Sequence, residues 1–221
     1  MTVQTRTILF DLDGTLIDSA PDLAGAANDL RRTRGLDIVA YEKLRPLVGS
    51  GARGMIGGAF GMAPGDAGFE ALRDEFLARY AQRLLQQTSI FAQVATLLDR
   101  LDALHLRWGI VTNKALRYAE PVAAGLGLLA RAAVLIGGDS TPFSKPHPAP
   151  LLEAARRIGA EPEHCVYVGD DHRDVVAGRA AGMRTLAAGW GYLGQGEAID
   201  AWGADAVIEQ PLALLHWLEV A

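Results

Sequence analysis

Short apolar runs that alternate with segments of helical periodicity restrict the fold of this chain more than any other feature. The runs are bounded by glycine or acidic residues and span 7–10, 107–112, 133–136, 165–168, 184–188 and 206–208. Most of the segments between them keep one apolar face, as at 94–104 and 151–158. This alternation predicts an α/β fold, a Rossmann-like parallel sheet with helices on both faces. Ligands of such sheets gather at the carboxyl ends of the strands.

Residues 17–85 interrupt the alternation, because they contain no convincing strand. Two apolar stripes at helical spacing occur there, one at 23, 26, 27 and 30 and the other at 69, 72, 76, 77, 80 and 84. They predict an all-α cap domain (17–85) inserted into an α/β core domain made of 1–16 and 86–221. The middle of the insert, residues 48–58, is rich in glycine and contains Arg53. The glycines are typical either of a flexible loop or of a segment that closes over a ligand.

The composition is that of an ordinary soluble globular protein. Of the 221 residues, 50% are hydrophobic and 21% charged, and the formal net charge is −5. This charge argues against nucleic acid as a partner, because binding a phosphate backbone requires a basic excess. The apolar runs are too short to cross a bilayer and the N-terminus lacks a signal-peptide layout, so we expect no membrane partner and a cytoplasmic location. Cys165 is expected to be a core thiol, and the oligomeric state is unknown.

Two carboxylates, Asp11 and Asp13, directly follow the first apolar run. Side chains at i and i+2 project from the same face of an extended segment, and Gly14 lets the chain turn just beyond them. Two like charges so close favour a cation between them. Mg²⁺ suits such a site, since it combines a few carboxylates with phosphate oxygens of a substrate. The alternative is an acidic turn without a ligand.

Polar side chains follow three further runs at the same predicted edge of the sheet. Thr112, Asn113 and Lys114 offer hydroxyl, amide and ammonium donors to the phosphoryl group of a substrate. Lys145 lies in a loop stiffened by proline, where a fixed cation meets the charge of an attacking carboxylate and of phosphoryl oxygens. The run at 165–168 is followed by three carboxylates, Asp170, Asp171 and Asp174. Each piece alone fits a cap or a surface group, but all four in this order indicate phosphate chemistry.

The four pieces resemble the four motifs of the haloacid dehalogenase-like (HAD) hydrolase superfamily, and the chain is most similar to its phosphoglycolate phosphatase branch. The similarity extends over nearly the whole chain and is strongest at 10–19, 111–114 and 145–151. The resemblance implies that Asp11 attacks phosphorus and forms an aspartyl-phosphate, which divides the hydrolysis into two steps. It implies that Asp13 is the general acid and base. An aspartate at this position indicates phosphate esters, because the dehalogenases of the superfamily lack this acid and its ion-pumping ATPases have threonine.

The resemblance also implies which groups hold the phosphate and the metal. Thr112 and Lys145 would bind the phosphoryl group. Asp11, Asp170 and the backbone carbonyl of Asp13 would hold Mg²⁺, which lets an anion approach an anion.

Two supporting carboxylates complete the implied site. Asp174 would orient Lys145 or the waters of the metal. Asp171 replaces a common serine, and its added charge either tightens the metal site or faces solvent. The chain also departs from the branch at 91–93, where Tyr-Pro-Gly is usual, and at Ala115, where proline is usual.

The expected substrate is a small phosphorylated metabolite with a carboxylate, of the 2-phosphoglycolate type. Residues 68–76 and 202–205 are also similar to N-acetylmuramic acid 6-phosphate phosphatases of peptidoglycan recycling. Both substrates carry a carboxylate that the bidentate fork of Arg53 can bind. One arginine does not discriminate between them.

Two alternatives from other classes stay open. A phosphosugar mutase shares all four motifs, but protects its aspartyl-phosphate from water. A binding module without activity is the other alternative, and the intact set of Asp11, Asp13, Thr112, Lys145 and Asp170 argues against it.

Overall fold

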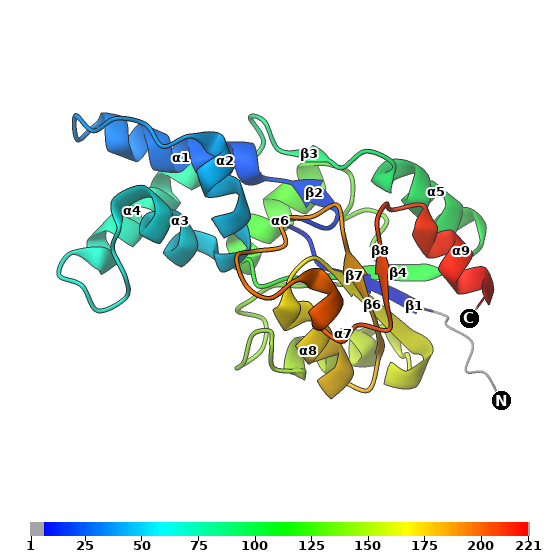
Figure 1. Cartoon of the computed structure of the whole chain (residues 1–221). Helices are drawn as coiled ribbons and strands as arrows, with labels where there is room; N and C mark the ends of the chain where they lie inside the picture. The colour runs from blue at the N-terminus through cyan, green and yellow to red at the C-terminus, as the bar shows by residue number, and fades with distance from the viewer. Residues whose placement is uncertain (1–6, 221) are drawn as a thin grey trace.

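A parallel sheet forms the centre of the protein (Figure 1). The structure is a computed structural model that describes residues 7–220; residues 1–6 and 221, which the predicted core domain includes, lie outside the described residues. Within 7–220, six strands pair in the order β5-β4-β1-β6-β7-β8, and every pairing is parallel. The strands are β1 (Thr7–Phe10), β4 (Arg107–Val111), β5 (Leu135–Ile136), β6 (Cys165–Gly169), β7 (Arg184–Ala188) and β8 (Ala206–Ile208). The predicted α/β fold is confirmed.

The order of the strands brings three of the predicted motifs to one place. β1 lies between β4 and β6, and Phe10 at its end is opposite Ile110 and Val168. Because parallel strands in register end at the same edge, the segments that follow β1, β4 and β6 emerge side by side. The carboxyl edge of these three strands is therefore the place to look for a site.

Helices cover both faces of the sheet. Ile8 and Phe10 of β1 pack with α5, α6 and α9, whereas Leu9 packs on the opposite face with α7 and α8. These helices are α5 (Val94–Ala103), α6 (Leu116–Gly125), α7 (Ala149–Ile158), α8 (His172–Ala180) and α9 (Ala213–Val220), with short 3₁₀ turns η2 (Pro162–His164) and η3 (Ile199–Ala201). Cys165 is a buried free thiol, as predicted. Among the described residues, no helix is both long and apolar enough to cross a membrane.

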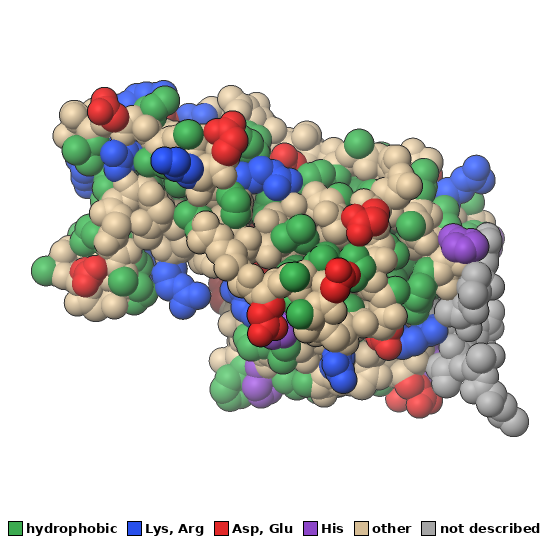
Figure 2. All heavy atoms as spheres, viewed as in Figure 1, with side chains coloured by type: hydrophobic (Ala, Val, Ile, Leu, Met, Phe, Trp, Pro, Cys, Tyr) green, Lys and Arg blue, Asp and Glu red, His purple; other side chains and the backbone are tan. Residues whose placement is uncertain are grey.

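A helical module lies beside the core, at the left of Figure 1. It contains α1 (Ala20–Arg32), α2 (Tyr41–Leu44), the 3₁₀ helix η1 (Arg45–Ser50), α3 (Gly51–Phe60) and α4 (Phe69–Ala81). Both predicted apolar stripes face the interior of this module, where Leu30 and Phe76 are completely buried. Figure 2 shows the surface hollowed between the module and the core. We propose that residues 17–85 form a cap domain over a core domain made of the rest.

The prediction that residues 17–85 contain no strand is wrong at their first two positions. β2 (Ile17–Asp18) pairs antiparallel with β3 (Ser89–Ile90). Two residues are too few for an alternating pattern to be read from sequence. The strands form because the two segments that join the module to the core run side by side.

The glycine-rich segment is largely helical, although glycine is a poor helix former. A Cβ atom on Gly58 would lie 2.2 Å from Cδ1 of Leu47, and one on Gly54 would lie 2.4 Å from the backbone oxygen of Leu47. The glycines therefore let η1 pack closely on α3. Burial of Met55 and Ile56 on the other side of α3 offsets the low propensity.

Candidate active site

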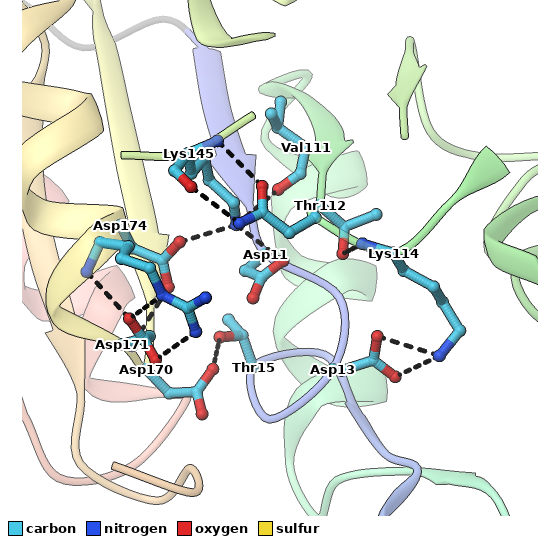
Figure 3. Close-up of polar contacts among 12 residues, drawn as sticks. Asp11, Asp13, Thr15, Val111, Thr112, Lys114, Lys145, Asp170, Asp171 and Asp174 are labelled. Carbon is cyan, nitrogen blue, oxygen red and sulfur yellow. Dashed lines mark hydrogen bonds and ion pairs between the residues drawn. The ribbon is translucent and has the colours of Figure 1, made fainter. Parts of the chain in front are cut away.

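Asp11 follows β1 and lies at the middle of a group of polar side chains (Figure 3). Its backbone N–H donates to the carbonyl oxygen of Val168 at 2.9 Å, which extends the pairing of β1 with β6. The chain bends at Leu12, and Gly14 has a φ of 89°. The extended conformation therefore ends before Asp13, although the expectation that Asp11 and Asp13 share one face required it to continue. Figure 3 shows the Asp13 carboxylate directed away from Asp11, toward Lys114.

Two buried carboxylates join Asp11 instead. Asp11, Asp170 and Asp174 each offer an oxygen within 4.8 Å of the others. Burial, and then the charges of Asp11 and Asp174, raise the pKa of Asp170 well above its ordinary value. Buried carboxylates that repel one another fit a divalent cation, since such a cation accepts hard oxygen ligands and neutralises the charge.

Lys145 supplies the positive charge that the chain itself places in this group. Its Nζ lies 2.9 Å from Oδ1 of Asp11 and 2.7 Å from Oδ1 of Asp174, and the residue is only 4% exposed. Burial alone lowers the pKa of Lys145, but the two carboxylates outweigh it and raise that pKa. Nζ also donates to the hydroxyl of Tyr167 at 2.7 Å, and this hydroxyl donates to the carbonyl of Val111 at 2.7 Å. Lys145 is therefore a fixed cation beside Asp11.

Asp13 is held by a different set of groups. Its oxygens lie 2.9 and 3.1 Å from Nζ of Lys114, and Oδ1 also accepts a short hydrogen bond from the hydroxyl of Ser19. Lys114 lies 4.7 Å from the ring centroid of Tyr80, a residue of the helical module. Asp13 thus stands between the core and the module. Its predicted role as a metal ligand through the backbone carbonyl stays a prediction.

Thr112 and Asn113 follow β4 as predicted, and their contacts differ. Thr112 is 3% exposed and its hydroxyl accepts from the backbone N–H of Lys114 at 3.2 Å. The side-chain amide of Asn113 donates to the backbone oxygen of Lys145 and accepts from its N–H, both at 2.9 Å. The observed contacts of Asn113 position Lys145, and the prediction that Asn113 binds substrate stays a prediction.

Asp171 begins a helix. Its side chain accepts from the N–H of Arg173 at 2.9 Å and, with Asp174, forms a capping box at the start of α8. Nε and Nη2 of Arg173 each lie 2.7 Å from an oxygen of Asp171. Burial opposes ionisation of Asp171, but Arg173 outweighs it and lowers the pKa of this carboxyl. Asp171 is therefore paired with an arginine and lies outside the group of three acids that offers ligands to a cation.

A cavity of about 280 Å³ connects these groups with the helical module. Asp11, Asp13, Thr112, Lys145 and Asp170 line its floor. The module adds apolar side chains, Leu23, Val48, Phe76, Leu77 and Tyr80. The cavity therefore has the groups predicted to bind phosphate on its core side and apolar side chains on its module side.

Arg53 does not line this cavity. It lines an adjacent recess with His172, Gln195 and Trp202, and the two hollows share Ser50, Asp171 and Arg173. The arginine that lines the main cavity, apart from Arg173, is Arg117 at the start of α6. No carboxylate is within ion-pair distance of Arg117 among the described residues.

Tyr167 was missed by sequence reasoning. Its motif reads as a plain buried strand, and the only signal was a hydroxyl inside an otherwise apolar run. A buried tyrosine hydroxyl requires hydrogen-bond partners. In the structure these partners are Nζ of Lys145 and the carbonyl of Val111.

Comparisons with known proteins identify the family. The chain matches a family model described as haloacid dehalogenase-like hydrolase over residues 8–188. It is 49% identical over 207 residues to a phosphoglycolate phosphatase of Xanthomonas campestris pv. campestris (strain 8004), covering 93% of each chain. It is 42% identical over 219 residues to an N-acetylmuramic acid 6-phosphate phosphatase of Pseudomonas putida, covering 99% of this chain and 98% of the relative. The crystal structure of a predicted phosphoglycolate phosphatase from Haemophilus somnus 129PT superposes with a TM-score of 0.86 at 26% identity, covering 98% of this chain and 99% of the other.

Proposed function

Since this chain belongs to the haloacid dehalogenase-like hydrolase family, we propose that it is a phosphatase that uses Mg²⁺ to hydrolyse a small phosphate ester bearing a carboxylate. The observation that carries the proposal is the convergence of Asp11, Lys145 and Asp170 at one sheet edge, with Asp13 directed to the other side of the same cavity. An attacking carboxylate, a fixed cation and a second acid are the groups that two-step phosphate ester hydrolysis requires.

Asp11 and Asp13 divide the reaction between them. An oxygen of Asp11 forms a bond to phosphorus while the bond from phosphorus to the ester oxygen breaks. Asp13 gives its proton to the departing alcohol. Asp13 then takes a proton from water, whose oxygen attacks phosphorus and releases inorganic phosphate and free Asp11. Thr112 and Lys145 hold the phosphoryl oxygens during both steps.

The metal belongs to the group of acids beside Asp11. Asp11, Asp170 and the backbone carbonyl of Asp13 would hold Mg²⁺, and Asp174 would keep Lys145 in place through its 2.7 Å ion pair. When bound, Mg²⁺ neutralises charge, so that a carboxylate can approach a phosphate dianion.

Two leaving groups are compatible with the cavity. Its volume, about 280 Å³, is near the lower limit of roughly 300 Å³ for pockets that enclose drug-sized ligands. It admits the two-carbon unit of 2-phosphoglycolate, and it also admits the phosphorylated end of an amino sugar. The relatives bear the names of both activities, so we propose 2-phosphoglycolate as the substrate type and N-acetylmuramic acid 6-phosphate as the alternative.

A comparison of three esters tests the proposed function. We expect phosphate release from 2-phosphoglycolate or N-acetylmuramic acid 6-phosphate with a kcat/KM at least about tenfold above that for N-acetylglucosamine 6-phosphate, which lacks a carboxylate. No release from any of the three, or equal values for all, would contradict the proposal. Incubation of a hexose phosphate with a trace of its bisphosphate tests the mutase alternative, for which we expect no isomerisation.

We expect activity to depend on Mg²⁺ and Ca²⁺ to inhibit. Ca²⁺ takes more oxygen ligands at longer distances, so it draws the attacking carboxylate of Asp11 into its own shell. The measurement is phosphate release after exhaustive chelation and after return of each metal. Beryllofluoride with Mg²⁺ should also inhibit, because it mimics a phosphoryl group on Asp11. Full activity in the chelated protein would overturn the metal assignment.

We expect Arg117→Ala to lower kcat/KM for carboxylate-bearing esters by roughly 1.5–3 kcal/mol, the usual range for a hydrogen bond to a charged group. Arg117 lines the cavity that contains Asp11, whereas Arg53 lines the adjacent recess. Arg53→Ala is therefore the matched control, and we expect it to have little effect. Both variants should keep their activity on an aryl phosphate without a carboxylate. A selective loss in Arg53→Ala alone would return the carboxylate-binding role to Arg53.

A further inference from the structure

The segment that follows β7 contacts Asp170, the loop that follows Asp11 and the helical module at once. The backbone N–H of Tyr192 donates to Oδ2 of Asp170 at 2.8 Å. The indole N–H of Trp190 donates to the carbonyl oxygen of Thr15 at 3.0 Å. A Cβ atom on Gly191 would lie 2.1 Å from Cβ of Asp170, so the segment is packed directly against this acid.

The hydroxyl of Tyr192 binds the residues through which the chain enters the helical module. It accepts from the backbone N–H groups of Ser19 at 2.8 Å and Ala20 at 3.1 Å, and it donates to Oδ1 of Asp18 at 3.0 Å. All of its hydrogen-bonding capacity is therefore used. Ser19 is the N-cap of α1, and its own side chain makes no capping hydrogen bond. A hydroxyl from the core thus satisfies the N–H of Ser19, and it shares the N–H of Ala20 with Oδ1 of Asp18, which lies 3.2 Å away.

The ring of Tyr192 packs inside the module although its backbone belongs to the core. The residue is 4% exposed and is part of the module's apolar cluster. The guanidinium of Arg45, in η1, lies 5.0 Å from the ring centroid and donates to the backbone oxygen of Gly191 at 3.2 Å. These contacts fix the ring from the module side.

The contacts of Tyr192 continue to Asp13. Ser19, whose N–H is held by Tyr192, donates its hydroxyl to Oδ1 of Asp13. Tyr192 therefore contacts Asp170 through its backbone N–H and is linked to Asp13 through Ser19.

We propose that Tyr192 is a positioning residue that ties the first connection to the helical module, residues 18–20, to Asp170 and thereby sets the position of Asp13. The tie itself follows from contacts alone, whereas its effect on turnover rests on the proposed function. Phenylalanine at position 192 keeps the ring and the backbone N–H to Asp170, and removes only the hydroxyl.

Hydrogen exchange of the metal-free protein tests the tie independently of any activity. In Tyr192→Phe, the amide of Ser19 should exchange about tenfold faster, because it loses its acceptor, whereas the amide of Ala20 keeps Oδ1 of Asp18 at 3.2 Å. The matched control is Thr88→Val in the second connection, where the hydroxyl and N–H of Thr88 both donate to Asp22 at 2.8 Å. It should leave the exchange of Ser19 and Ala20 unchanged. Unchanged exchange in Tyr192→Phe would overturn the proposal.

Steady-state kinetics test the consequence for Asp13. Tyr192→Phe should lower kcat about tenfold for an alkyl phosphate, whose leaving group needs a proton, and much less for an activated aryl phosphate, with KM for the aryl ester unchanged. Asp18→Asn weakens the same tie from the other side and should reproduce this selectivity, which guards against a folding defect in one variant. Equal losses on both esters, or no loss on either, would contradict the positioning of Asp13. If the amide of Ser19 exchanges faster in Tyr192→Phe but the protein does not hydrolyse esters through Asp11 and Asp13, the tie stands and only the proposed function is rejected.

Discussion

Asp11→Asn is expected to abolish turnover, with a loss of several orders of magnitude in kcat, while the fold survives. An amide has nearly the shape of a carboxylate, but it neither attacks phosphorus nor offers a charged oxygen to a cation. Phosphate release is measured with enough enzyme to detect about one part in 10⁵ of the normal rate.

Stability separates this result from unfolding. Asp11 is one of the charges that raise the pKa of Asp170, so its removal relieves repulsion among buried acids. The same change also removes one of the two carboxylate partners of Lys145, so we expect the metal-free variant to stay folded with a Tm close to that of the unmodified protein. Asp99→Asn, at a side chain that is 71% exposed and paired with Arg131, is the control for the same chemical change and should remain active. Substantial activity in pure Asp11→Asn would show that another group is the nucleophile.

The sheet was predictable because its strands are buried on both faces. Such strands read as short continuous apolar runs, and all six predicted runs form strands, although β5 is limited to Leu135–Ile136. The edge that carries the site followed from the same pattern, because parallel strands end together.

The connections between core and module were not predictable in the same way. β2 and β3 are two residues each and exist only as a pair. α3 forms against the propensity of its glycines, because Gly54 and Gly58 accept the close approach of Leu47. In both places contacts between segments distant in the chain decide the local structure, and a reading of local pattern does not contain them.

The candidate site also has a part that local sequence predicts and a part that it does not. Residue types and their places after strands pointed to Asp11, Lys145 and Asp170, which lie together. The direction of a side chain after a bend is set by backbone angles, so the separation of Asp13 from Asp11 was not readable. Tyr192 was not identified either, because the partners of its hydroxyl lie more than 170 residues away along the chain.

Asp13→Asn is expected to slow the first turnover of an alkyl phosphate by about 10²–10⁴-fold, the usual contribution of general acid–base catalysis. An alkoxide leaves poorly without a proton, whereas an activated aryl oxide leaves readily. The first turnover of an aryl phosphate should therefore be slowed much less. Rapid-quench measurement of the released alcohol follows this step for both esters.

The second step gives Asp13→Asn a further signature. Water attacks the phosphorylated Asp11 without its base, so an aryl phosphate should show a burst of product equal to the enzyme present, followed by slow turnover. Nζ of Lys114 lies 2.9 Å from Oδ1 of Asp13 and fixes the position of this carboxylate, which both steps need. Lys114→Met should therefore slow both steps. Equal slowing of both esters in the first turnover, without a burst, would instead mean that Asp13 serves the metal and the geometry of the loop, and the proton would have to come from elsewhere.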